Sequence, residues 1–155
     1  MTEALAVLPP PLDHDTVDRA WTDLRGTGTD LAAFEAKRPL IDAVFGGSPF
    51  LRDLILRDSD FAGRILVTDP DSMLAELIDG LAAEVADEPE MRRLLRKTRG
   101  RAALTIALAD LGGVWSLDQV TDALTRFAEA MLNAAVEWLL SDQRRAGKLL
   151  SASGE

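Results

Sequence analysis

Apolar residues recur at intervals of three and four along most of the chain, which is the spacing of one face of an α-helix. The clearest stripe lies in the last third and consists of Leu117, Val120, Leu124, Phe127, Met131, Ala134 and Trp138. Ser116, with Gln119 three residues later, forms a capping box in front of this stripe. We therefore predict a long helix from about Ser116 to Leu140 that packs along its length on partner helices.

Two further long segments have the same periodicity. Glu88-Pro89 precedes a predicted helix from about Glu90 to Leu111, and Gly112 and Gly113 follow it as a stop. Thr68 or Asp69, followed by Pro70, opens another helix, whose apolar stripe is Met73, Leu74, Leu77, Leu81 and Val85.

Shorter helices are expected between residues 16 and 66, each delimited by a capping residue, a proline or a glycine pair. Their expected positions are 16–24, 30–37 with Asp30 as the cap, a continuation past Pro39 to Phe45, a helix after Ser48-Pro49, and one or two turns after Asp58 or Ser59. No segment shows a convincing period of two. We predict an all-α fold, a bundle-like array of helices without a sheet.

Length and composition fit a soluble globular protein. The chain has 155 residues, of which 47% are apolar and 28% charged. We expect a flexible lead-in over residues 1–12, which contains the triple proline, one helical domain over 13–150 and a flexible tail over 151–155. The N-terminus lacks the features of a signal peptide, and no apolar run approaches the length of a membrane span.

Charge and cysteine content exclude several function classes. The formal net charge of −9 argues against a general nucleic-acid binder, because attraction to phosphates needs a basic surface. The absence of cysteine excludes disulfides, zinc-thiolate sites and a cysteine nucleophile. We expect a cytoplasmic protein that binds neither nucleic acid nor membranes.

Basic residues are concentrated in one short stretch. Residues 1–91 carry 19 acids and 7 bases, whereas 92–155 carry 7 acids and 10 bases. Six of the bases lie close together: Arg92, Arg93, Arg96, Lys97, Arg99 and Arg101. Because like charges on one helix repel each other, a counter-charge is expected. It is either the acidic front part of the same chain, or an external acidic surface or a nucleotide phosphate.

One pattern resembles a nucleotidyltransferase site. Gly47-Ser48 is followed ten residues later by Asp58-Ser59-Asp60, and such a carboxylate pair can hold Mg²⁺ when both residues lie on a strand. Here the intervening residues have helical spacing. On a helix, positions i and i+2 diverge by about 200°, so the two carboxylates cannot share a metal.

The remaining polar motifs are better explained as structural features. Asp13-His14-Asp15 and Asp69-Pro70-Asp71 lie at expected helix starts, where carboxylates stabilise unpaired N–H groups. Gly26-Thr27-Gly28 lacks the strand and third glycine of a phosphate loop and is expected to join two helices. Trp21, Trp115 and Trp138 are expected in the core. We predict no catalytic residue, no cofactor-binding residue and no metal ligand in this chain.

Two segments resemble one enzyme family. GGSPFLRDLILRDSDFAGRIL, residues 46–66, is similar to an early helix of glutamine synthetase adenylyltransferase/deadenylyltransferase, which reads "NSPFL…LL…P.F". Residues 92–140 resemble its later arginine-rich helix, its "DL.G" turn and the helix that follows. The segment ALTIALADLGGVWSL is similar to the sequences of the alphaproteobacterial branch of this family.

The resemblance implies part of a large bifunctional enzyme. Such enzymes attach AMP from ATP to a tyrosine of glutamine synthetase and remove it by phosphorolysis, use Mg²⁺ and respond to PII signal proteins and glutamine. The matched residues form the helical lead-in to a catalytic domain, whose Gly-rich motif with metal-binding aspartates does not occur in this sequence. In the arginine-rich helix, relatives often carry an Arg and a Glu at two positions that are Thr105 and Ala102 in this sequence.

The resemblance therefore implies a non-catalytic segment whose partners are the downstream catalytic domain, glutamine synthetase and PII. ATP and Mg²⁺ are implied for the complete enzyme and none for this chain. Two alternatives stay open: a stand-alone interaction module that dimerises through the Leu117–Trp138 face, and an enzyme active by itself.

Overall fold

The computed structural model describes residues 13–147, which form eight α-helices, one 3₁₀-helix and no strand. The helices are α1 (His14–Gly26), α2 (Ala32–Ala36), α3 (Arg38–Gly47), α4 (Pro49–Arg57), α5 (Ser59–Val67), α6 (Pro70–Asp79), η1 (Gly80–Ala82), α7 (Glu88–Leu111) and α8 (Leu117–Arg145). The predicted all-α class is confirmed. The expected lead-in 1–12 and tail 151–155 lie outside the described residues.

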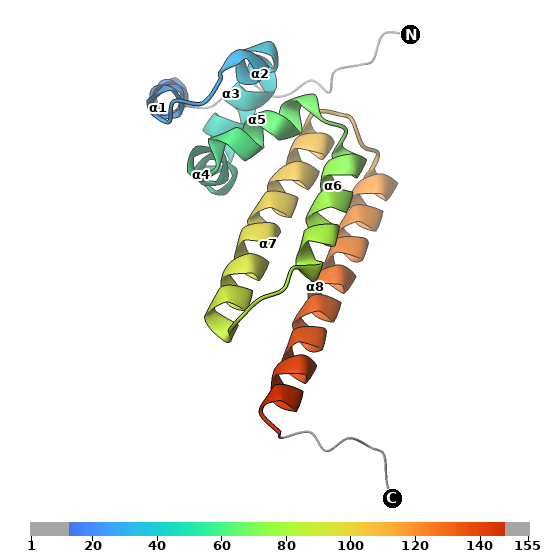
Figure 1. Cartoon of the computed structure of the whole chain (residues 1–155). Helices are drawn as coiled ribbons and strands as arrows, with labels where there is room; N and C mark the ends of the chain where they lie inside the picture. The colour runs from blue at the N-terminus through green and yellow to red at the C-terminus, as the bar shows by residue number, and fades with distance from the viewer. Residues whose placement is uncertain (1–12, 148–155) are drawn as a thin grey trace, which may run out of the picture.

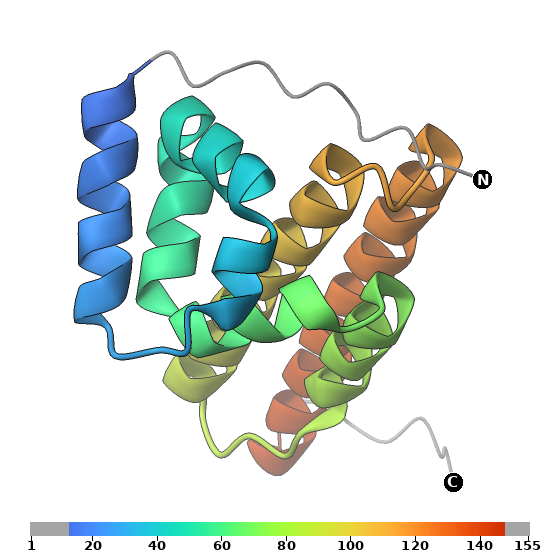
Figure 2. The ribbon, with the colours of Figure 1, turned by 90° about the horizontal axis from the view of Figure 1, so that it is seen from above.

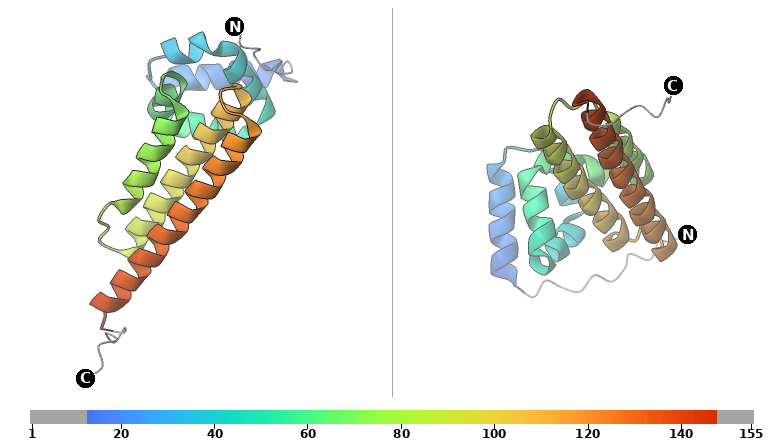
Figure 3. Two further views of the ribbon diagram at one scale, coloured as in Figure 1. Left: turned by 90° about the vertical axis from the view of Figure 1, so that its right-hand side faces the viewer. Right: turned by 90° about the horizontal axis from the view of Figure 1, so that it is seen from below.

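The helices form two groups that share α7. Helices α1 to α5 gather at one end of the molecule, and α6, α7 and α8 run side by side away from them in alternating directions (Figure 1). The upper part of α7 also packs against α4 and α5. Seen from the side, the molecule is elongated, and the C-terminal end of α8 extends beyond its neighbours (Figure 3).

Local capping explains where the longer helices begin. The Ser48 hydroxyl accepts a hydrogen bond from the Leu51 amide, as the Ser-Pro start predicts. Asp69 caps α6, and Asp87 caps α7 two residues before the proline. The capping box of Ser116 and Gln119 is present at the start of α8. Side-chain oxygens here bind amides that have no partner within the helix.

The predicted end of the helix after Pro70 and the predicted cap at Asp30 are wrong. The helix after Pro70 ends at Asp79 rather than at Val85, because the chain turns at Gly80 into a short 3₁₀-helix. This turn lets Leu81 and Val85 reach buried positions next to α7 and α8. In addition, Asp30 is not a helix N-cap: its carboxylate accepts from the Ala32 amide at 3.0 Å, while Leu31 holds the capping position of α2.

The core of the upper group centres on α1 and α3, which lie side by side with α4 (Figure 2). The Trp21 and Phe45 rings meet edge to face with centroids 5.6 Å apart. The Trp21 indole donates to the Asp42 carboxylate at 2.6 Å, and the guanidinium of Arg38 lies over the ring. The buried indole thus keeps a polar partner, as aromatic packing requires.

The long C-terminal helix is confirmed, although it continues past the predicted end at Leu140 to Arg145. Its predicted packing face is partly wrong. Phe127 is buried as expected, and Ala123, one turn earlier, is buried with it. Leu117 and Leu124 are 77% and 52% exposed, although both belong to the predicted stripe. The contact with α6 and α7 covers a different side of α8, so these two leucines point outward.

Candidate interaction surfaces

The carboxylates of the nucleotidyltransferase-like pattern do not meet. Asp58 lies at the junction of α4 and α5 and pairs with Arg101. Asp60 lies in the first turn of α5 and accepts from the Thr29 hydroxyl at 2.7 Å. Across residues 13–147, no three His, Cys, Asp or Glu side chains are placed to hold a metal ion. The helical interpretation of this segment is confirmed.

The other acidic motifs serve the helix starts. Asp13 caps α1 and accepts hydrogen bonds from the hydroxyl and the amide of Thr16, which lower the pKa of its carboxyl. Asp69 accepts from the Ser72 amide at 2.9 Å. Asp71 accepts from the Trp115 indole at 3.3 Å and so ties α6 to the turn before α8. None of these carboxylates is free to serve a cluster.

The glycine motif after α1 also has a structural role. Gly26 ends the helix, and Gly28 has a φ of +78°, a conformation that favours glycine. This confirms that the segment is a loop between two helices.

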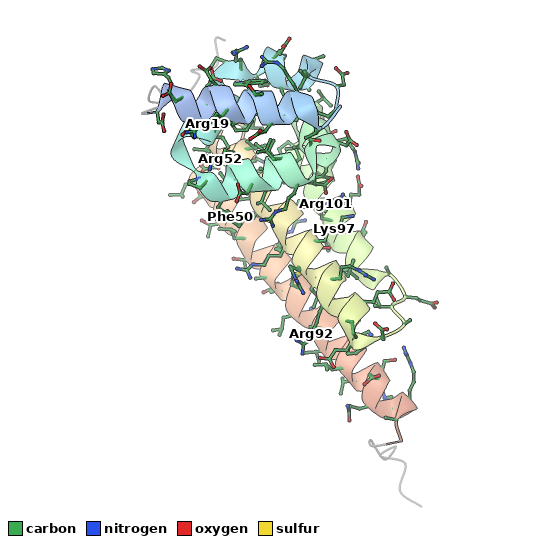
Figure 4. The ribbon with its side chains drawn as sticks, turned by 90° about the vertical axis from the view of Figure 1, so that its left-hand side faces the viewer. Arg19, Phe50, Arg52, Arg92, Lys97 and Arg101 are labelled. Carbon is green, nitrogen blue, oxygen red and sulfur yellow. The ribbon has the colours of Figure 1, made fainter. Side chains whose placement is uncertain are left out.

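Three of the six cations of the basic stretch form ion pairs, all with carboxylates of residues 1–91. The Arg92 Nε lies 2.8 Å from Glu88, one turn earlier on α7, and Arg93 lies 3.9 Å from Glu90. Arg101 reaches across to Asp58 on the neighbouring helices. The other three cations, Arg96, Lys97 and Arg99, have no carboxylate partner among the described residues. Figure 4 shows Lys97 on α7 between the paired Arg92 and Arg101.

Two of these cations, Arg96 and Lys97, line what we call the basic groove, which lies between α7 and the corner of α4 and α5. It has a volume of about 590 Å³. Its cationic residues are Arg57, Arg93, Arg96, Lys97 and Arg101. Leu54, Phe61 and Leu104 contribute apolar surface, and Asp58 is its acidic residue. Since Arg101 already neutralises Asp58, the groove presents a net positive surface.

Arg101 and Gly100 shape this groove. The Arg101 guanidinium lies over the Phe61 ring, 4.4 Å from its centroid, and pairs with Asp58 at the same time. Gly100 lets α4 approach closely, because a Cβ at this position would lie 3.1 Å from the Leu54 Cδ2. Ala102 and Thr105, where relatives often carry a Glu and an Arg, do not line this groove, and both are fully buried.

A second groove of about 890 Å³ lies at the lower end of the molecule, between the 83–86 segment and the C-terminal half of α8. Trp138 lines it, and the indole nitrogen of Trp138 is buried without a hydrogen-bond partner among residues 13–147. Of the three tryptophans expected in the core, Trp21 and Trp115 are buried, whereas Trp138 is half-buried. It faces this groove together with Leu81 of η1 and Met91 of α7.

The outward side of α8 carries exposed apolar residues, and those after Leu124 lie outside the predicted stripe. Its exposed large apolar residues are Leu117, Leu124, Leu132, Val136, Leu139 and Leu140. Single exposed leucines are common on protein surfaces, but a line of them along one helix is typical of a contact surface. The signal was available in the sequence, because apolar residues occupy more of this helix than one packing face needs.

Comparison with known proteins identifies the family. The family described as glutamate-ammonia ligase adenylyltransferase matches residues 40–153, more than half of the chain. The chain belongs to this family. The resemblance that the basic helix and the glycine turn indicated is thereby confirmed, and the matched range includes the basic groove and α8.

Several relatives carry the name bifunctional glutamine synthetase adenylyltransferase/adenylyl-removing enzyme. The protein of Caulobacter vibrioides is 38% identical over 153 residues, which is 96% of this chain and 15% of the relative. That of Xanthobacter autotrophicus is 49% identical over 105 residues, 66% of this chain and 11% of the relative. That of Bradyrhizobium diazoefficiens is 42% identical over 111 residues, 70% and 11% respectively.

The chain thus spans about 15% or less of the length of these adenylyltransferase relatives. No solved structure matches it. Within residues 13–147, no helix is both long and apolar enough to cross a membrane.

Proposed function

We propose that this chain acts as the non-catalytic helical segment of an adenylyltransferase that adds AMP to a tyrosine of glutamine synthetase or removes it. The observation that carries the proposal is the family match over residues 40–153. The structure supports it as well, because Asp13 and Asp69 cap helices and Asp58 forms an ion pair with Arg101. In this assignment, the segment supports a catalytic portion of the enzyme and does no chemistry itself.

Magnesium and ATP are proposed to bind elsewhere in such an enzyme. The residues of this segment do not fit a metal-nucleotide site, because Asp58 and Asp60 diverge and Asp58 is held by an arginine. The catalytic domain of the enzyme, glutamine synthetase and the PII signal protein are the proposed partners.

The basic stretch of α7 is the proposed contact with the catalytic domain. Arg96, Lys97 and Arg99 are exposed and unpaired within the described residues, and Arg92 and Arg93 have mainly solvent-exposed side chains. Exposed like charges on one helix repel each other, so an acidic partner surface would stabilise them. The apolar floor of the basic groove would add buried area to the same contact.

Hydrogen exchange tests this proposal. The remaining part of the Caulobacter vibrioides relative is added to the 155-residue chain, and exchange is followed across residues 91–111. We expect the amides at the start of α7 to become protected on addition, because the partner would stabilise the exposed first turns. The α2 region, none of whose residues lines the basic groove, is the internal control.

Unchanged hydrogen exchange on α7, at concentrations where the two parts bind, would show that the basic stretch does not contact the added part. Failure of the two parts to associate would contradict the proposed role of the segment.

A further inference from the structure

The outward side of α8 carries a regular pattern of its own. Large and small residues alternate along it in the order Leu117, Thr121, Leu124, Ala128, Leu132, Ala135 and Leu139. The steps are four, three and four residues, repeated twice, which makes two units of eleven residues. This average of about 3.67 residues per turn is close to the α-helical value, so the line runs almost straight along the helix. We call these seven residues the outer stripe.

Six of the seven residues of the outer stripe are exposed. Leu117 is 77% exposed and Leu132 64%, while Leu124 and Leu139 are about half exposed. Thr121 and Ala128 are exposed between them, and Ala135 is half-buried. Large side chains separated by small ones form the ridges and grooves into which a second helix packs.

The outer stripe is separate from the side of α8 that contacts the rest of this chain. That inner side is marked by Ala123 and Phe127, which are buried against α6 and α7. At 100° per residue, its centre lies about 120° around the helix from the outer stripe. A partner can therefore cover the outer stripe without displacing the core.

Charge indicates what kind of partner fits. Asp118, Asp122 and Glu129 border the outer stripe on the edge away from the core, and all three are exposed. Arg126 lies further round and pairs with Asp122 at 3.5 Å. An antiparallel second copy centred on Ala128 would bring two Glu129 carboxylates together, which opposes self-pairing. A partner helix bordered by lysine or arginine would instead gain opposite charges.

We infer that the outer stripe is the docking site for an apolar helix, bordered by basic residues, from the remaining part of the adenylyltransferase polypeptide. This inference rests on the proposed function and names a second contact, distinct from the basic stretch of α7. The length of the relatives supports this occupant, since this chain corresponds to 15% of the Caulobacter vibrioides protein and the other 85% is available to cover α8.

The test is calorimetric titration of the 155-residue chain with the remaining part of the Caulobacter vibrioides relative. Leu132→Glu places a charge in the middle of the outer stripe and changes no core residue, so we expect at least tenfold weaker binding. Glu129→Lys should also weaken binding, and more at low salt than at high salt, because it reverses the border charge. Asn133→Glu is the matched control, since Asn133 is also exposed but lies away from the outer stripe, where it lines the second groove.

The outcomes separate the two proposals. Binding of the unaltered chain that Leu132→Glu leaves unchanged would overturn the outer-stripe assignment and leave the proposed function standing. Absence of binding by the unaltered chain would contradict both. The solution mass of the chain by itself tests a second copy: a dimer that Leu132→Glu converts to a monomer would make the second copy the occupant and overturn the inference. Circular dichroism of each variant checks that the fold is retained.

Discussion

Arg101 holds Asp58 with two guanidinium nitrogens, since its Nε lies 2.8 Å and its Nη2 2.7 Å from the same carboxylate oxygen. The pair joins the middle of α7 to the junction of α4 and α5, and both side chains are about one-third exposed. Together with the packing of α7 on α4 and α5, it connects helices α6 to α8 with the upper group of helices. It also explains why Asp58, the most enzyme-like carboxylate of the sequence, has a structural role.

This pair should contribute measurably to stability. We expect Arg101→Met to lower the free energy of unfolding by about 1.5–3 kcal/mol, the usual range for hydrogen bonds to charged groups. Asp58→Asn should cost less, because the amide oxygen still accepts a hydrogen bond. Urea unfolding of both single variants and the double variant gives the coupling energy. A coupling energy near zero would show that the ion pair between Arg101 and Asp58 does not stabilise the fold.

The two sides of α8 should respond differently to truncation. Phe127→Ala should destabilise the chain by about 3–5 kcal/mol, because the ring is buried against α6 and α7. Leu124→Ala should change stability by less than about 0.5 kcal/mol, since its side chain is half exposed and contacts mainly solvent. Thermal or urea unfolding measures both. Equal losses would mean that Leu124 is buried in solution, as the original stripe predicts.

Two glycines give opposite expectations for the same substitution. Gly100→Ala should stabilise α7 by up to about 1 kcal/mol, because alanine favours a helix and the Leu54 side-chain end can shift from 3.1 Å. Gly112→Ala should destabilise by about 1–3 kcal/mol, since its Cβ would lie 2.8 Å from the Leu108 carbonyl oxygen, which is backbone and cannot move alone. Unfolding midpoints compare the two. A loss with Gly100→Ala would show that α4 is held rigidly against α7.

Asp13 links the first helix to pH. Hydrogen bonds from Thr16 favour the ionised carboxylate and lower its pKa in the folded state below 3.8. The stabilisation is therefore present above the unfolded-state pKa, near 4, and is lost as pH falls through the lower folded value. We expect Asp13→Asn to make stability less sensitive to acid below pH 4. Carboxyl titration followed by nuclear magnetic resonance checks the direction, and a midpoint at or above 3.8 would contradict it.

The chain by itself should be catalytically silent. Because Asp58 and Asp60 diverge and are held by Arg101 and Thr29, we expect neither attachment of AMP to glutamine synthetase nor its removal. Labelled AMP on glutamine synthetase, followed with and without the chain, measures both directions. Activity that Asp58→Ala or Asp60→Ala abolishes would require the two carboxylates to converge in solution, contrary to the structure.

The sequence alone determined the features of the fold that depend on residues close together in the chain. The helices, the starts at Ser48, Asp69 and Ser116, and the separation of Asp58 from Asp60 all follow from spacing and capping, which act within a few residues. The family resemblance was also readable, because it rests on the order of residues.

Only the tertiary structure decided which surfaces are covered. Along α8, apolar residues occupy two sides of the helix, and periodicity cannot tell which side a partner covers. The spacing therefore predicts that Leu117 and Leu124 lie in the packing face, although both are exposed. Likewise, the charges of the basic stretch do not reveal that Arg101 pairs across to Asp58 while Arg96 and Lys97 remain unpaired within the described residues. Burial and ion pairing join residues that are distant in sequence, so they are set by the packing of whole helices.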